Sequence, residues 1–203
     1  LVFLSACSTF VALLLSAIIV EAVGANWADV WNALLDGSLR KPGRWGKTLG
    51  AAVPMAMVAV GTIISTKVGL INIGQEGQML VGAAFAAYVG AHAPGSGPVV
   101  ICLIIIGGFV GGAFWSGLAG ALRYWRNVPE VLTTLLLVTV AANLVGYGLK
   151  NTWLLLDPDA AFGNRALVGR QLDPDSRLPR IEIFGNDFSL SVILALVIIF
   201  FTT

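Results

Sequence analysis

A polar cluster in the stretch VGLINIGQEGQML, residues 68–80, has the strongest chemical character in this sequence. One carboxylate, Glu76, and three amides, Asn72, Gln75 and Gln78, stand between apolar residues on both sides. A carboxylate at the middle of a bilayer costs about 2.5–3.5 kcal/mol on insertion scales, so such residues usually face a bundle interior or a water-filled path. The cluster therefore predicts either a polar pathway through a membrane or a direct role in binding a cation.

Glycines surround the cluster and predict a break in the helix. Gly69, Gly74 and Gly77 allow the backbone to leave helical geometry, which at membrane depth is tolerated only where protein or a cavity covers it. One interpretation is a broken or re-entrant helix near 68–78 that lines a translocation path. The other is a polar helix junction whose amides cap exposed backbone groups near the interface. We predict as pathway residues Asn72, Gln75, Glu76 and Gln78, with Gly74 and Gly77 as the backbone break.

A second group of polar residues lies in RYWRNVPEVLTTL, residues 123–135, and just beyond it. Pro129 suits the first turn of a helix and Glu130 stands where the helix dipole favours an acid, so capping accounts for both. Amides and hydroxyls within a span prefer other helices to lipid. We therefore expect inward-facing side chains at Thr133, Thr134 and Asn143, and we keep Glu130 as a secondary functional candidate.

Composition places these residues in an integral membrane protein. Hydrophobic residues make up 57% of the chain and charged residues 11%, and the mean hydropathy is +0.87. The 12 Lys and Arg residues are scattered, which argues against a nucleic-acid partner. Cys7 and Cys102 lie in separate apolar runs and are expected as buried free thiols. We find no P-loop, no catalytic triad and no metal-ligand spacing, so we predict neither enzymatic activity nor a metal or other cofactor.

The hydropathy pattern predicts an all-α, polytopic transmembrane helix bundle with about six spans. The expected spans are 2–20, 48–66, 77–91, 98–122, 129–149 and one that begins near 188. Segments 21–47 and 150–187 are long and polar; the first has apolar residues at helical spacing, which predicts a short amphipathic helix, and the second has turn signals. Small residues four apart in 98–122, such as Gly108 and Gly112, predict close helix packing, within this chain or between two copies.

The charge distribution and the two ends of the sequence give two further indications about this chain. The side that holds the two long loops has nine Lys and Arg residues and the other side has three, so the positive-inside rule places the long loops in the cytoplasm. The sequence begins at Leu1 without Met and stops directly after an apolar run. We therefore expect it to be part of a longer protein.

The stretch KVGLINIGQEGQMLVGAAFAAYVG resembles the GLFNIGAEGQ motif of permease subunits in ABC importers for nucleosides and simple sugars. These permeases form part of a larger family that also serves ribose and branched-chain amino acids. The segments LGAAVPMAMVAVGTIIST and VPEVLTTLLLVTVAANLVGYGLK resemble the family's neighbouring segments, in the same order. Pro129 and Val138 replace two asparagines of the family pattern, so no role of those amides is carried over to these positions.

The resemblance implies an ATP-driven importer that moves a nucleoside or simple sugar across the bacterial inner membrane by alternating access. Its implied partners are a cytoplasmic ABC ATPase that hydrolyses ATP, a second permease subunit, an extracytoplasmic solute-binding lipoprotein and the lipid bilayer. Residues 1–203 would be one permease domain, incomplete at its C-terminal end, with the ATPase-docking segment beyond Thr203. The long loops 21–47 and 150–187 would be extracytoplasmic, opposite to the charge count.

Two other functional classes fit the polar cluster without the resemblance. In an ion-coupled secondary transporter, Glu76 would titrate or bind the coupling cation, and uptake would depend on an ion gradient. In a non-transporting membrane scaffold, the glycine-rich faces would assemble a complex.

Overall fold

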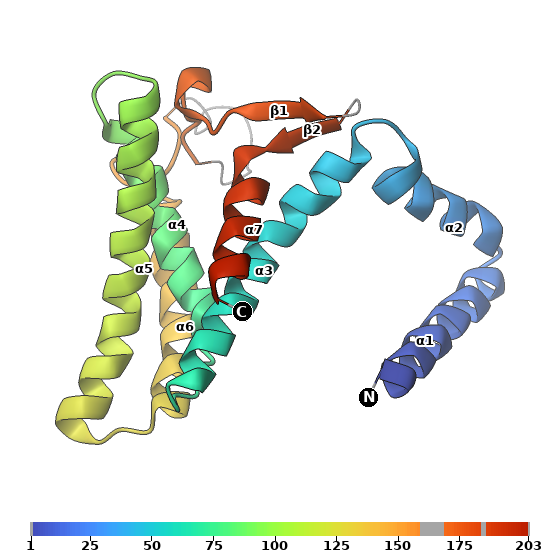
Figure 1. Ribbon diagram of the computed structural model, residues 1–203, viewed down its shortest axis with the longest axis horizontal. Coiled ribbons are helices and arrows are strands. Elements are labelled where there is room, and N and C mark those ends of the chain that lie inside the picture. Colours follow the sequence, from blue (N-terminus) through green and yellow to red (C-terminus); the bar gives the residue numbers. More distant parts are fainter. Residues whose placement is uncertain (1, 159–168, 184–185, 203) are drawn as a thin grey trace. The chain divides into compact units, whose positions relative to one another are not determined.

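The computed structural model describes residues 2–158, 169–183 and 186–202 (Figure 1). The chain divides into two compact units, Leu1–Ala51 with Ile181–Phe188 and Ala52–Arg180 with Ser189–Thr203. The described residues are mainly helical, and their regular strands are limited to one two-stranded hairpin. The predicted all-α membrane helix bundle is confirmed.

The first unit contains the N-terminal helices and the hairpin. Helix α1 (Val2–Ala22) is followed by α2 (Trp27–Leu35), a π-helical turn η1 (Asp36–Arg40) and the start of α3 (Arg44–Lys67). Asn26 caps α2 by accepting the Ala28 N–H at 2.8 Å, and the Trp27 and Trp31 rings lie 5.9 Å apart on one side of that helix. The amphipathic helix predicted within 21–47 is therefore present. The hairpin pairs β1 (Arg180–Ile183) with β2 (Asn186–Ser189).

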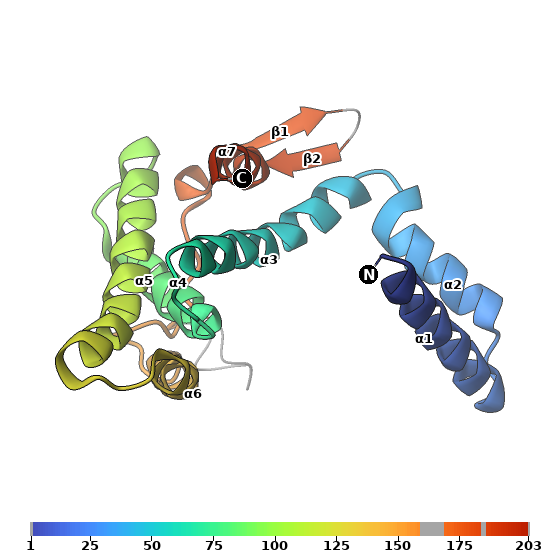
Figure 2. The ribbon, with the colours of Figure 1, turned by 60° about the horizontal axis from the view of Figure 1, so that its bottom comes forward.

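The second unit is built around three neighbouring helices. Helices α4 (Gln75–His92), α5 (Pro98–Arg126) and α6 (Glu130–Gly148) pack against one another, as Figures 1 and 2 show. Their common core consists of Val81, Trp115 and Ala141, one residue from each helix. Trp115 also donates its indole N–H to the Leu137 carbonyl at 3.3 Å, so the aromatic ring joins α5 to α6 by packing and by a hydrogen bond. The unit also contains the 3₁₀ turn η3 (Pro174–Ser176) and α7 (Leu190–Thr202).

Glycines let α4 and α5 approach each other closely. A Cβ atom added to Gly82 would lie 2.9 Å from the Gly108 carbonyl oxygen and 3.5 Å from the Gly112 nitrogen. Gly107 and Gly111 are buried on the same helix pair. The predicted small-residue packing is therefore found within this chain, while Gly117 has open space around it.

The number of helices able to cross a membrane by length and composition is lower than predicted. Four described helices meet both criteria: Phe3–Ala22, Arg44–Lys67, Pro98–Arg126 and Glu130–Gly148. Helix α4 begins with Gln75, Glu76 and Gln78, which lower its hydropathy, and α7 has 13 described residues where a span needs about 20. The expectation of buried cysteines was also wrong, because Cys7 and Cys102 are both exposed on the apolar helices α1 and α5.

The predicted loop 150–187 has short and irregular structure where it is described. Leu156 and Gly169 form an isolated antiparallel bridge, and the turn signal at 173–175 corresponds to η3. Residues 159–168 and 184–185 of that loop, including the turn residues Asp159 and Gly185, lie outside the described residues.

Candidate functional site

Of the two interpretations of residues 68–78, the structure shows the helix junction: a non-helical segment, here called the break, lies between the separate helices α3 and α4. Helix α3 ends at Lys67, Gly69 has φ of +78°, and α4 begins at Gln75, so segment 69–74 connects the two helices without helical geometry. The positive φ at Gly69 is one that other residues rarely adopt, and it redirects the chain as it leaves α3. Gly74 is the N-cap of α4 and belongs to the break as predicted. Gly77 does not, because it is a buried residue inside α4.

Gly77 serves helix packing in place of the backbone break that we predicted. A Cβ atom at this position would lie 3.0 Å from the Val138 Cα and 3.3 Å from both the Leu137 carbonyl oxygen and the Trp115 Nε1. The missing side chain therefore lets the first turn of α4 lie directly against the backbone of α6. From the sequence we expected a structural role for Gly77, but the sequence did not distinguish a backbone break from close helix packing.

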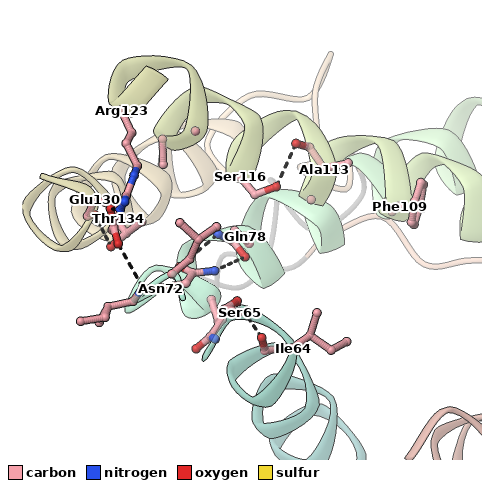
Figure 3. Close-up of a pocket in the computed structure, with 18 residues that line it drawn as sticks. Ile64, Ser65, Asn72, Gln78, Phe109, Ala113, Ser116, Arg123, Glu130 and Thr134 are labelled. Carbon is pink, nitrogen blue, oxygen red and sulfur yellow. Dashed lines mark hydrogen bonds and ion pairs between the residues drawn. The ribbon is translucent and has the colours of Figure 1, made fainter. Parts of the chain in front are cut away.

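The Asn72 side chain organises the break through three hydrogen bonds. Its Oδ1 accepts the Gly74 N–H at 2.9 Å, which turns the backbone toward the start of α4. Its Nδ2 donates to Gln78 Oε1 at 3.2 Å, and Gln78 Nε2 donates back to Asn72 Oδ1 at 3.3 Å. The two amides thus form a reciprocal pair between the break and the first turn of α4 (Figure 3).

Helix α6 supplies acceptors to the backbone of the break. Glu130 Oε1 accepts the Ile71 N–H at 3.1 Å, and Thr134 Oγ1 lies 3.4 Å from the Ile73 nitrogen, whose N–H it accepts. The second carboxylate oxygen of Glu130, Oε2, pairs with Arg123 at the end of α5. The Glu130 side chain is 16% exposed and Arg123 is 47% exposed, so the carboxylate lies on the inner side of this ion pair. Figure 3 shows Arg123, Glu130 and Thr134 in one row beside Asn72.

A cavity of about 730 Å³ lies beside these residues. Its polar lining combines amides, hydroxyls and one ion pair, while glycine, alanine and larger apolar side chains form the remainder. Ser65 and Ser116 line it too, and each donates its hydroxyl to a carbonyl of its own helix, Gly61 and Ala113 respectively. The Gln75 Nε2 is buried and, within the part of the chain that the structure describes, has no hydrogen-bond partner. The polar lining residues are Ser65, Asn72, Gln75, Gln78, Ser116, Arg123, Glu130 and Thr134.

The structure separates the predicted residues into three groups. Lining the cavity are Asn72, Gln75, Gln78, Glu130 and Thr134. Gly74, Gly77 and Thr133 are buried nearby, and Thr133 donates its hydroxyl to the Pro129 carbonyl at 3.1 Å. The cavity lining does not include Glu76, which is exposed, because it follows Gln75 on the helix and points to a different face from Gln75 and Gln78.

The inward-facing expectation was correct for two residues and wrong for one. Thr133 and Thr134 are 5% and 4% exposed. Asn143 is exposed, and its Nδ2 donates to the Thr139 carbonyl of its own helix at 2.8 Å. A bond of this kind satisfies a polar side chain without a neighbouring helix, which is why the presence of an amide in a span did not identify its direction.

Arg123 is the site residue that the sequence prediction missed. It was not singled out from the sequence, although the short connection 127–129 brings it back to Glu130. An available signal was the pair of opposite charges at the facing ends of two spans joined by a very short loop.

Comparison with known proteins identifies the family of this chain. Residues 46–203 match the family described as the permease component of the branched-chain amino acid transport system. The chain belongs to this permease family. The matched residues include the break, α4 to α6 and the cavity lining, and the resemblance noted in NIGQEGQ is confirmed. Together with the long apolar helices, membership makes the chain a multi-pass membrane protein related to ABC transporter permeases.

Three curated relatives of this permease chain are transporters of sugars or nucleosides by name. The glucose ABC transporter permease TsgB13 of Haloferax volcanii is 30% identical over 68% of this chain and 37% of its own length. The guanosine ABC transporter permease NupP of Bacillus subtilis is 28% identical over 66% of this chain and 39% of its own length. The nucleoside ABC transporter permease NupB of Lactococcus lactis subsp. cremoris is 34% identical over 61% of this chain and 34% of its own length.

The matched region therefore spans between about a third and two fifths of the length of these relatives. No solved structure matches this chain.

Proposed function

We propose that this chain is a permease subunit of an ATP-driven importer that moves a nucleoside or simple sugar across the membrane by alternating access. The observation that carries the proposal is the cavity of about 730 Å³ at the helix break, with amides and hydroxyls in its wall. Broken helices with polar groups at their ends are a recurrent way to build solute sites at membrane depth. Asn72, Gln75 and Gln78 are the proposed pathway side chains, with Gly74 at the break.

The chemistry of the cavity favours an uncharged solute that forms many hydrogen bonds. The two charged groups in the lining, Arg123 and Glu130, pair with each other, so the wall offers an ionic solute no unpaired counter-charge. The Gln75 Nε2, buried and unpaired among the described residues, can donate a hydrogen bond to a solute oxygen or ring nitrogen. A buried donor that has no acceptor costs about 1–3 kcal/mol. Phe109, 77% exposed and in the same lining, supplies an aromatic face. Nucleosides and sugars have this combination of polar edges and apolar faces.

The relatives support the same class of solute. Their names specify glucose, guanosine and nucleosides, and all three are called ABC transporter permeases. We extend to this chain the shared class, a neutral solute with several hydroxyl or ring-nitrogen groups.

The proposed assembly follows from the same family relationship. We propose a cytoplasmic ABC ATPase as the source of energy, a second permease subunit, identical or homologous, and an extracytoplasmic solute-binding lipoprotein, all at a bacterial inner membrane. In this arrangement residues 1–203 belong to one permease domain, and the long segments 21–47 and 150–187 face the outside. ATP binding and hydrolysis then shift the population between an inward-open and an outward-open bundle.

The proposal is tested by uptake in cells that express the full-length permease with its transport partners. Radiolabelled guanosine and glucose serve as probes, and the variants are Asn72→Ala, Gln78→Ala and the matched control Asn143→Ala. We expect the first two to lower uptake at least about tenfold, since each breaks a half-buried amide pair in the cavity wall, while the exposed Asn143 position has little effect. Glu76→Ala should lower uptake less than Asn72→Ala, because Glu76 does not line the cavity.

The energy source separates the proposal from its alternatives. Depletion of ATP should stop uptake, whereas an uncoupler that leaves ATP intact should not. Uptake that survives ATP depletion and collapses with the uncoupler would identify an ion-coupled transporter. Undiminished uptake in both Asn72→Ala and Gln78→Ala, at normal expression, would remove the cavity from the pathway.

A further inference from the structure

We propose that Glu130 is a positioning residue that fixes the backbone of the break by accepting the Ile71 N–H, while Arg123 holds its other carboxylate oxygen. Ordinary helix capping accounts for an acid in the first turn of α6, but it does not account for these two specific partners. The link from this positioning to transport depends on the proposed function. The positioning itself does not.

The geometry assigns a separate task to each carboxylate oxygen. Oε1 accepts the Ile71 N–H at 3.1 Å, and Oε2 pairs with the Arg123 guanidinium. The Glu130 side chain is only 16% exposed whereas Ile71 is 60% exposed, so the carboxylate is the shielded partner of this contact. An ionised acceptor also makes a stronger hydrogen bond than a neutral one. The carboxylate therefore connects three segments: the end of α5, the start of α6 and the break.

The connection between α5 and α6 sets the position of Glu130 relative to Arg123. Helix α5 ends at Arg126, and its C-cap Asn127 has a left-handed backbone with φ of 52° and ψ of 30°. Its N–H donates to the Arg123 carbonyl at 3.0 Å, and the Val128 N–H reaches the Leu122 carbonyl at 3.4 Å, a closure typical of helix C-termini. Only three residues then separate the two helices, so the ion pair closes a short and well-defined turn.

The contact affects the cavity because Ile71 and its neighbour Asn72 both line it. Ile71 has no place in a helical hydrogen-bond ladder, and because the residue is 60% exposed, its N–H has water as the alternative to Glu130. If Glu130 releases this N–H, the backbone that presents the Asn72 side chain loses one of its two hydrogen bonds to α6 and keeps the one from Ile73 to Thr134. Two explanations of how the ion pair supports the break can then be separated. In one, the opposite charges of residues 123 and 130 are sufficient; in the other, the oxygen that accepts the Ile71 N–H is required.

Two double variants make opposite predictions for these explanations. Arg123→Glu with Glu130→Arg restores opposite charges, but a guanidinium has only donors and cannot accept the Ile71 N–H. Arg123→Gln with Glu130→Gln removes both charges but keeps an amide oxygen for Ile71, with the amide nitrogen free to donate to the residue at position 123. If the acceptor positions the break, the neutral pair preserves it and the exchanged charges do not.

Hydrogen–deuterium exchange resolved to single amides measures this in the full-length permease in nanodiscs. We expect exchange at Ile71 to rise by no more than about fivefold in the neutral pair, whose amide oxygen is the weaker acceptor, and by at least about tenfold with the exchanged charges, which remove the acceptor altogether. The exchanged charges also oppose two helix dipoles, so amides of α5 and α6 serve as the reference for general destabilisation. Wild-type protection at Ile71 with exchanged charges, or its loss in the neutral pair alone, would overturn the proposal.

Two additional measurements keep the test decisive. If the exchanged-charge protein does not accumulate, Arg123→Gln alone replaces it: both oxygens of Glu130 remain, so Ile71 should stay protected, and lost protection contradicts the proposal. Uptake of guanosine and glucose is recorded in parallel. Faster exchange at Ile71 with unchanged uptake would support the positioning role and reject the proposed pathway, whereas unchanged exchange with lost uptake would reject the positioning role alone.

Discussion

Replacing Gly82 with alanine tests the close packing of α4 against α5. The added Cβ would lie 2.9 Å from the Gly108 carbonyl oxygen, about 0.5 Å inside the 3.4 Å at which ordinary contact begins. The obstacle is backbone, so no side chain can rotate away and the two helices must separate. Overpacking of this kind costs about 1–3 kcal/mol, and the better helix propensity of alanine offsets about 0.5–1 kcal/mol of it.

The expected net loss of unfolding free energy is therefore about 1–2 kcal/mol, a factor of roughly five to thirty in the ratio of folded to unfolded protein. Gly117→Ala is the matched control, since Gly117 lies within α5 with nothing inside 4 Å of the added atom. The assay is unfolding of the full-length protein by titrated SDS in bicelles. Our reasoning about this helix pair fails if Gly82→Ala is as stable as Gly117→Ala.

Three further predictions use the same unfolding titration. Gly74→Ala should lower the unfolding free energy by about 1–3 kcal/mol and reduce uptake, because its Cβ would lie 2.8 Å from Thr134 Cβ and 3.0 Å from the Thr134 carbonyl oxygen. Asn127→Val should cost about 1–2 kcal/mol because a β-branched residue fits poorly at φ of 52°, whereas Asn127→Gly should be tolerated; equal effects would argue against the left-handed turn. Thr134→Val should cost about 1 kcal/mol by removing the acceptor of Ile73, and Thr133→Val, whose hydroxyl bonds only its own helix, should cost less; the reverse order would contradict the contact between α6 and the break.

Features of the fold that depend only on residues close together in the chain could be predicted from the sequence. The helical spacing of Trp27, Val30 and Trp31 predicted α2, and the glycines with the amides of 69–78 predicted a break followed by a polar helix start. Asn72 and Gln78 combine features of both interpretations of that stretch: Asn72 accepts a backbone N–H at the junction, and both amides line the cavity.

The remaining features depend on which faces of the helices meet. Helix α6 is apolar on all sides, so no polar stripe indicated that Thr134 points inward and Asn143 outward. Gly77 shows the same limit, because a glycine permits a break and a close contact equally well until a neighbour is known. The contact of Glu130 with Ile71 joins residues 59 positions apart, and no local pattern contains it.

The reciprocal amide pair has a consequence for how the proposed pathway can meet its cargo. Asn72 Oδ1 accepts two N–H groups, while each amide nitrogen of the pair donates one of its two N–H groups and Gln78 Oε1 accepts one. Among the described residues, one N–H on each nitrogen and one lone pair on Gln78 Oε1 therefore remain available, and a passing solute can bond to them without breaking the pair. The Gln75 Nε2, buried and unpaired in the described part of the chain, adds a further donor to the same wall. Two side chains that hold each other in place while keeping donors and an acceptor available lose little further conformational entropy when a solute binds to them.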